Sequence, residues 1–102
     1  MAYENGALDA TLAAAAGDDP ALLTELRHAF AESMAQQVDL LRRSRCDGNW
    51  NMAAMRLKGL AASFHAEGLI GFAEEALDSA PGDPVVIRKL ERFLAEFTTT
   101  GG

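Results

Sequence analysis

Hydrophobic residues recur every three or four positions along most of this chain, in segments that are separated by turn-forming residues. This spacing is typical of helices that bury one face, because an α-helix turns by about 100° per residue. No segment alternates apolar and polar residues with the period of two that indicates a half-buried strand. The pattern therefore predicts an all-α protein, an antiparallel four-helix bundle with an additional short N-terminal helix.

Clusters of Gly, Asp and Pro mark the expected ends of these helices. In residues 17–20 and 81–84 an Asp stands directly before a Pro, which predicts a capping carboxylate followed by the first helical position. The Asp-Gly-Asn run at 47–49 separates two long apolar-periodic segments. We expect one domain over residues 1–102, with helices at about 5–16, 20–46, 49–65, 67–80 and 84–97 and a frayed tail over 98–102.

Projection of each segment onto a helix gives it one apolar face. Charged residues such as Glu32 and Arg92 fall on the opposite faces. The predicted buried residues are Leu23, Leu26, Phe30, Met34, Val38 and Leu41 in the second segment, Leu69, Phe72, Ala73, Ala76 and Ala80 in the fourth, and Val86, Leu90, Phe93 and Phe97 in the last.

The third segment has an unusual outward face. Its predicted core face consists of Ala53, Leu57, Leu60, Ala61 and Phe64. The opposite stripe holds Met55, Lys58, Gly59 and Ala62, where a solvent-facing helix ordinarily carries Glu, Lys or Gln. A glycine inside a helix costs about 1 kcal/mol relative to alanine, so we expect this stripe to have a role that compensates for Gly59.

Charge and composition exclude several classes of protein. The 102 residues are 49% hydrophobic and carry a formal net charge of −6, which disfavours general attraction to nucleic acid or anionic lipid. No apolar run approaches the roughly 20 residues of a membrane span, and the first residues lack the basic and apolar regions of a secretory signal. Because the single Cys46 cannot form an internal disulfide, we expect a cytoplasmic protein.

Positive charge is concentrated near the third segment, in Arg42, Arg43, Arg45, Arg56 and Lys58. A basic patch on an acidic domain suits an acidic protein partner. An ordinary solvated helix end explains the same residues equally well.

The chain lacks the residue sets of an enzyme or a metal site. His28, His65 and Cys46 stand on separate segments and do not have the spacing of a ligand set. Glu74 and Glu75 are adjacent, so they diverge by about 100° on a helix and make a poor acid–base pair. We therefore expect no metal, no cofactor and no enzymatic activity.

The run from Ala54 to Gly59 carries a family resemblance. Its letters, Ala-Met-Arg-Leu-Lys-Gly, resemble the Ala-His-x-Leu-Lys-Gly pattern of histidine-phosphotransfer (HPt) domains. The resemblance extends from about Leu8 to Phe97 and includes the group at 77–80, which is similar to the family's downstream Leu-Glu-x-Ala. It implies a helical bundle that exchanges phosphoryl groups with response regulators in two-component signalling.

Met55 stands where the family has its phospho-accepting histidine, and a thioether has no nitrogen that could form a phosphoramidate. The resemblance implies that Lys58 would balance the charge of a phosphoryl group and that Gly59 would let a partner approach closely. His65 stands where the family commonly has glycine. Met55 itself is compatible with a docking residue, a tolerated apolar change or an engineered replacement of histidine.

We expect a non-phosphorylatable adaptor or competitor that binds the receiver domain of a response regulator, or a histidine kinase, through Met55, Arg56, Lys58, Gly59 and Ala62. Two alternatives stay open. One is an active histidine phosphocarrier, through His65 or with histidine restored at position 55. The other is a structural or oligomeric helical bundle.

Overall fold

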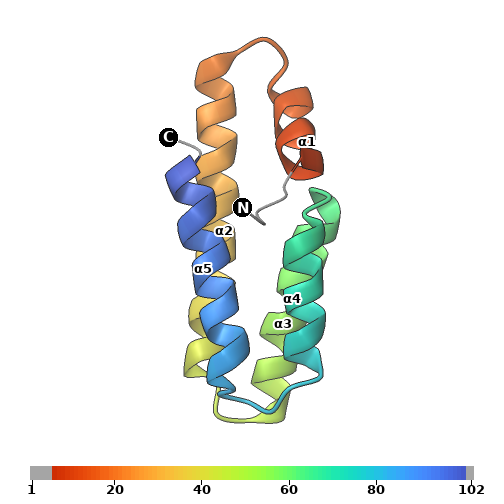
Figure 1. Ribbon diagram of the computed structural model, residues 1–102, viewed down its shortest axis with the longest axis vertical. Helices are drawn as coiled ribbons and strands as arrows, with labels where there is room; N and C mark the ends of the chain where they lie inside the picture. The colour runs from red at the N-terminus through yellow and green to blue at the C-terminus, as the bar shows by residue number, and fades with distance from the viewer. Residues whose placement is uncertain (1–5, 101–102) are drawn as a thin grey trace.

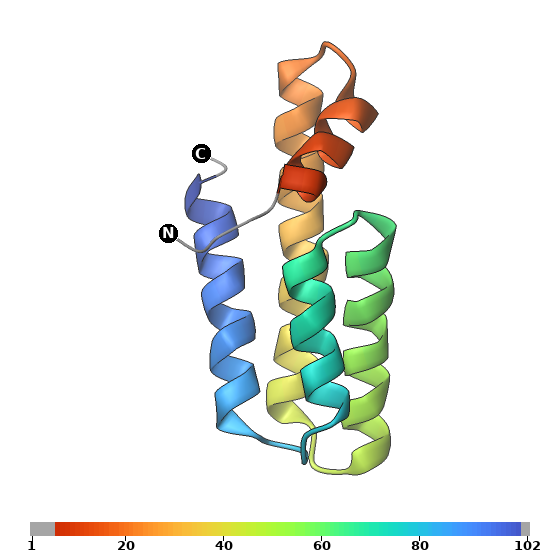
Figure 2. The ribbon, with the colours of Figure 1, turned by 45° about the vertical axis from the view of Figure 1, so that its right-hand side comes forward.

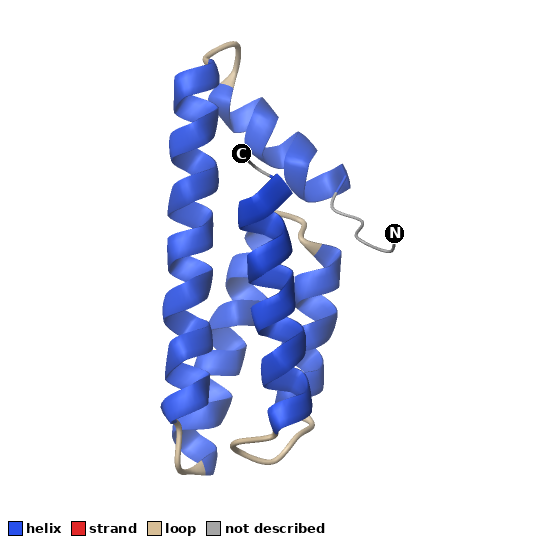
Figure 3. Cartoon of the chain, turned by 60° about the vertical axis from the view of Figure 1, so that its left-hand side comes forward, coloured by secondary structure: helices blue, strands red, loops and turns tan. Residues whose placement is uncertain are grey.

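The computed structural model describes residues 6–100, and all regular secondary structure in this range is helical. The prediction of an all-α protein is confirmed, and no strand occurs among the described residues (Figure 3). The helices are α1 (Gly6–Ala16), α2 (Pro20–Arg43), α3 (Asp47–Ser63), α4 (Glu67–Leu77) and α5 (Pro84–Thr100).

Two of the predicted helix starts depend on an aspartate cap. Asp19 Oδ1 accepts hydrogen bonds from the backbone N–H groups of Ala21 and Leu22, at 3.0 and 3.2 Å. Asp83 Oδ1 likewise accepts from the N–H of Val85 at 2.9 Å. Each carboxylate satisfies donors that the first helical turn leaves unpaired, and a proline follows it as the first helical residue.

Several helix ends differ from the prediction. The 47–49 run, expected to separate two helices, forms the first turn of α3, where the Asp47 carboxylate lies at the positive end of the helix dipole. Helix α4 ends at Leu77, so Ala80 is exposed and its assignment to the core was wrong. The predicted tail is helical over 98–100, and Thr98 and Thr99 donate hydroxyl hydrogen bonds to the Ala95 carbonyl. Residues 5, 101 and 102 lie outside the described range.

The long helix α2 and the α3–α4 hairpin organise the fold. Helix α2 packs against α3 and α5, and α4 packs against the same two helices from the other side. The chain reverses direction at each turn from α2 to α5 (Figure 1). Helix α1 packs beside the first half of α2, beyond the end of the α3–α4 hairpin (Figures 1 and 2).

The core lies where the predicted apolar faces meet. In α2, Leu23 and Leu26 are partly buried, whereas the four later apolar residues of the predicted face are fully buried. The four predicted residues of α5 are also buried, and α1 contributes Leu8, Leu12 and Ala16. Three phenylalanines from different segments meet edge to face, because Phe30 contacts Phe64 at 5.1 Å and Phe97 at 5.3 Å between ring centroids.

Trp50 joins α3 to α4 in the interior. Its side chain is fully buried, and its indole Nε1–H donates a hydrogen bond of 2.6 Å to the carbonyl of Ala76. A buried indole N–H without a partner would be costly, so this bond specifies how α3 and α4 are placed relative to each other.

His65 lies in the turn that follows α3. The helix ends at Ser63, and His65 has a φ of 59°, in the left-handed region that glycine adopts most easily. Its N–H bonds to the Ala62 carbonyl at 3.2 Å, while the N–H of Ala66 reaches back to Ala61 at 2.8 Å. This pattern is a Schellman turn with His65 at its left-handed position. The helix therefore ends two residues before the predicted position, because the chain leaves the helical path and reverses direction at His65.

We predict that His65→Gly raises the free energy of unfolding by about 0.5–1 kcal/mol. The left-handed strain of a residue with a Cβ is removed, and this gain exceeds the added entropy of the unfolded chain. Urea denaturation followed by circular dichroism measures the change.

His28→Gly is the matched control, because His28 is an exposed histidine inside the regular helix α2. There the same substitution should lower stability by about 0.5 kcal/mol. A loss of stability in both variants would contradict the strain assigned to His65.

Candidate functional site

The predicted docking stripe consists of the four outward residues of α3 and the neighbouring Arg56, and the structure places all five on the outer surface of this helix. Met55 has 55% of its surface exposed. Arg56, Gly59 and Ala62 are also exposed, and Lys58 is intermediate. On the opposite side Ala53, Leu57 and Ala61 are buried, while Leu60 and Phe64 are partly buried. The predicted division of α3 is thus seen at its buried and exposed residues, whereas Lys58, Leu60 and Phe64 are intermediate.

The fold itself gives no reason for glycine at position 59. A Cβ built on Gly59 would have no atom of the described residues within 4 Å beyond its own helix, so it would project away from the packed helices. Gly68 differs, because a Cβ there would touch the ring of Phe93 at 3.5 Å. The stability cost of Gly59 is therefore not offset by close packing within the chain.

Lys58, one of the stripe residues, forms an ion pair with α4. Its Nζ lies 3.4 Å from Oε2 of Glu74, and both side chains are about half exposed. An exposed pair of this kind contributes little stability, so it can exchange readily for another carboxylate. Arg56 makes no ion pair among the described residues, and it provides a further cation beside Met55.

A notch next to the stripe was missed by the sequence reasoning. It lies between the end of α2 and the start of α3 and has a volume of about 310 Å³. Met52 and Leu40, exposed by 51% and 36%, are its large apolar side chains. Arg43 and Arg56 provide its positive charge. Met52 precedes Met55 by three residues, and helical projection would have placed both on neighbouring parts of one face.

The positive charge of the predicted basic cluster is partly neutralised by acidic residues of α2 and α5. Asp39 accepts hydrogen bonds from Arg42 Nη2 at 2.7 Å and from Arg43 Nε at 3.0 Å. Arg42 also lies 3.6 Å from Glu91. The hydrogen bond from Arg42, followed by the charges of both arginines, lowers the pKa of Asp39 below its ordinary value of 3.8.

The two histidines are exposed and lie apart from the stripe's helix. His28 is on α2, and His65 is in the turn after α3 rather than on its surface. Among the described residues, no three His, Cys, Asp or Glu side chains are grouped closely enough to hold a metal ion.

Within residues 6–100, none of the helices combines the length and the apolar character needed to cross a membrane. Comparison of the chain with known protein families, with curated proteins and with solved structures found no match.

We predict that NMR titration will give Asp39 a carboxyl pKa below 3.8 and that Arg42→Gln will raise it. The hydrogen bond from Arg42 favours the ionised form of the Asp39 carboxyl group, and the Arg42→Gln variant loses this bond. Since the folded pKa is lowered, the stabilising effect is present above the unfolded pKa and is lost as pH falls through the folded value.

Arg88→Gln is the control, because Arg88 is an exposed arginine of α5 for which no contact with Asp39 is observed. An unchanged Asp39 pKa in the Arg42 variant would show that the hydrogen bond is not formed in solution.

Proposed function

We propose that this protein is an HPt-like four-helix bundle of a two-component phosphorelay that cannot itself carry a phosphoryl group. It binds the receiver domain of a response regulator, or a histidine kinase, and competes with active phosphotransfer proteins. The docking surface is the stripe of α3 formed by Met55, Arg56, Lys58, Gly59 and Ala62.

Two features of the backbone support the family resemblance. Helices α2 to α5 pack in a closed ring, in which each helix contacts two others and successive helices run in opposite directions. His65 has a positive φ at the position where HPt domains commonly have glycine. A chain that retains such a turn with a poorly suited residue is readily explained by descent from a glycine-containing relative.

The observation that carries the proposal is the environment of Gly59. This glycine lies inside a helix, is exposed, and has open space where its Cβ would be. It makes the helix less stable and contributes no internal packing, whereas it leaves the surface beside Met55 flat enough for another backbone to approach. Met55 adds a flexible apolar contact, which suits a binding surface.

Charge supports an acidic partner. Arg56 and Lys58 flank Met55, while the chain as a whole carries a net charge of −6. The acidic site of a receiver domain is complementary to these cations, so the affinity should fall as salt is added.

We predict that Gly59→Glu abolishes binding to a receiver domain while the protein stays folded. The new side chain adds bulk and negative charge at the centre of the stripe, where it would oppose an acidic partner. Binding of purified receiver domains is measured by isothermal titration calorimetry, and folding by circular dichroism.

Gly71→Glu is the matched control. Gly71 is exposed in α4, and its Cβ would also meet nothing within 4 Å, but it lies outside the stripe. This variant should bind as the unmodified protein does. Equal affinity of both variants would exclude docking through the stripe.

We predict that Met55→His accepts a phosphoryl group from a phosphorylated receiver domain and that the unmodified protein does not. A ring nitrogen at this position can attack the aspartyl phosphate, forming a phosphorus–nitrogen bond as the bond to the aspartate oxygen breaks. Mass spectrometry at neutral pH detects the adduct.

Transfer to the unmodified protein, mapped to His65 or His28, would identify an active phosphocarrier and contradict the adaptor function. Absence of transfer to both proteins, together with absence of binding, would favour a structural or oligomeric bundle.

A further inference from the structure

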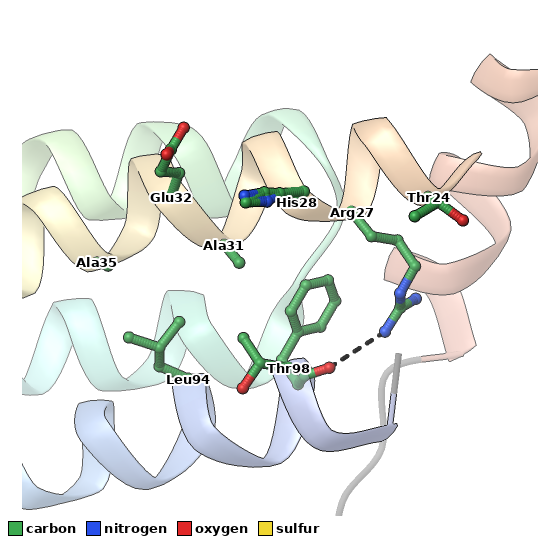
Figure 4. Close-up of a pocket in the computed structure, with 9 residues that line it drawn as sticks. Thr24, Arg27, His28, Ala31, Glu32, Ala35, Leu94 and Thr98 are labelled. Carbon is green, nitrogen blue, oxygen red and sulfur yellow. Dashed lines mark hydrogen bonds between the residues drawn. The ribbon is translucent and has the colours of Figure 1, made fainter. Parts of the chain in front are cut away.

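A groove of about 510 Å³ lies between α2 and α5, apart from the α3 stripe (Figure 4). Its volume is within the range of sites that hold small ligands, and the space between helices of a bundle is a common place for such sites. The residues that line it are Thr24, Arg27, His28, Ala31, Glu32, Ala35, Leu94, Phe97 and Thr98.

One part of this groove is apolar. Ala31 and Ala35 of α2 face Leu94 of α5 across it (Figure 4). The two alanines are only partly buried, because their short side chains do not fill the space between the helices. Aliphatic ligand groups that enter here would leave water for an apolar surface.

The other part of the groove contains Arg27, whose side chain extends from α2 toward α5 (Figure 4). Its guanidinium group lies 4.3 Å from the ring centroid of Phe97. Nη1 is 2.9 Å from Asp9 of α1, and Nη2 donates a long hydrogen bond of 3.3 Å to the carbonyl of Phe97. Among residues 6–100, the buried Nε–H has no hydrogen-bond partner.

This unpaired donor indicates the chemistry of a ligand. A guanidinium group offers donors only, and its Nε–Nη2 edge presents two N–H groups that match the two oxygens of a carboxylate. One of these donors is unpaired and the other makes only a long bond. The carboxylate of Glu32 points away from Leu94 and lies on the outer side of the groove, so it does not compete for this edge (Figure 4).

We propose that the groove binds a free aliphatic carboxylate. The carboxylate pairs with the Nε–Nη2 edge of Arg27, and the hydrocarbon chain lies along Ala31, Ala35 and Leu94. Positions 27 and 35 are eight residues apart on α2, which corresponds to about 12 Å of helix. Decanoate, whose extended chain has a similar length, is the matching probe.

Binding requires the buried Nε–H to turn toward the groove. The ion pair between Arg27 and Asp9 opposes this movement only weakly, since the side chain of Asp9 is 57% exposed. The charged head group of the ligand replaces the long bond to Phe97 with a shorter, charge-assisted one. This proposal is independent of the docking function assigned to α3.

Two-dimensional ¹H–¹⁵N NMR titration with decanoate, below its micelle concentration, tests the site. We expect shifts centred on the groove residues of α2 and α5. Butyrate, which has the head group without the long chain, and decyltrimethylammonium, which has the chain with a cationic head, should each bind at least about tenfold more weakly. Equal binding of decanoate and decyltrimethylammonium, or shifts spread over the surface, would overturn the proposal.

Two variants that replace an alanine by glutamate test where the hydrocarbon chain of decanoate binds. Ala35→Glu puts a charge into the apolar part of the groove and should weaken decanoate binding at least about tenfold. Ala29→Glu places the same side chain at an exposed position of α2 outside the groove and should leave the affinity within about twofold. Equal affinities of the two variants would exclude the groove as the site.

Arg27→Lys tests whether Arg27 binds the carboxylate head group of decanoate. Lysine keeps the positive charge but lacks the two-donor edge, so the preference for decanoate over decyltrimethylammonium should fall several-fold. This ratio is measured on one variant at a time and does not depend on how stable the variant is. An unchanged preference would show that Arg27 does not bind the carboxylate.

Discussion

The packing of α3 against α4 decides which face of α3 is exposed to solvent, and the proposed docking stripe lies on that face. Trp50 crosses this contact and donates its indole N–H to the carbonyl of Ala76. Because the distance between packed helices depends on the side chains at their contact, small residues let two helices approach closely. Both helices bury such residues completely, namely Ala54 and Ala61 in α3 and Ala73 and Ala76 in α4. Once this face of α3 is buried, its opposite face is exposed to solvent as a continuous stripe.

A binding surface on such a helix is rigid. The regular backbone of α3 holds Met55 and Gly59 at fixed positions one turn apart, and the core behind them prevents the helix from rotating. Lys58 is additionally oriented by Glu74 of α4. The proposed docking function thus uses a preformed surface, which lowers the entropy that association costs. The exposed methionines at 52 and 55 supply the adaptable part of this surface.

Arg27 connects α2 to the helices outside the α3–α4 hairpin. It links its own helix α2 to two others, because it pairs with Asp9 of α1 and with the carbonyl and ring of Phe97 in α5. Helix α1 is therefore attached to the rest of the protein by this ion pair as well as by the buried Leu8 and Leu12. The same residue lines the groove between α2 and α5, so a ligand that binds Arg27 there would also affect its ion pair with α1.

The sequence by itself determined the helices and their inner faces, since periodicity, aspartate caps and prolines are local properties. Phe30, Leu57 and Leu90 are buried as their spacing predicted, and Asp19 and Asp83 cap the helices that follow them. Local patterns did not predict that α3 ends before His65 or that Ala80 is exposed, because the packing of the hairpin decides where the chain turns. The notch at Met52 and the groove at Arg27 each combine side chains from two helices. Only the tertiary structure brought these residues together, because the approach of separate helices is set by the whole core.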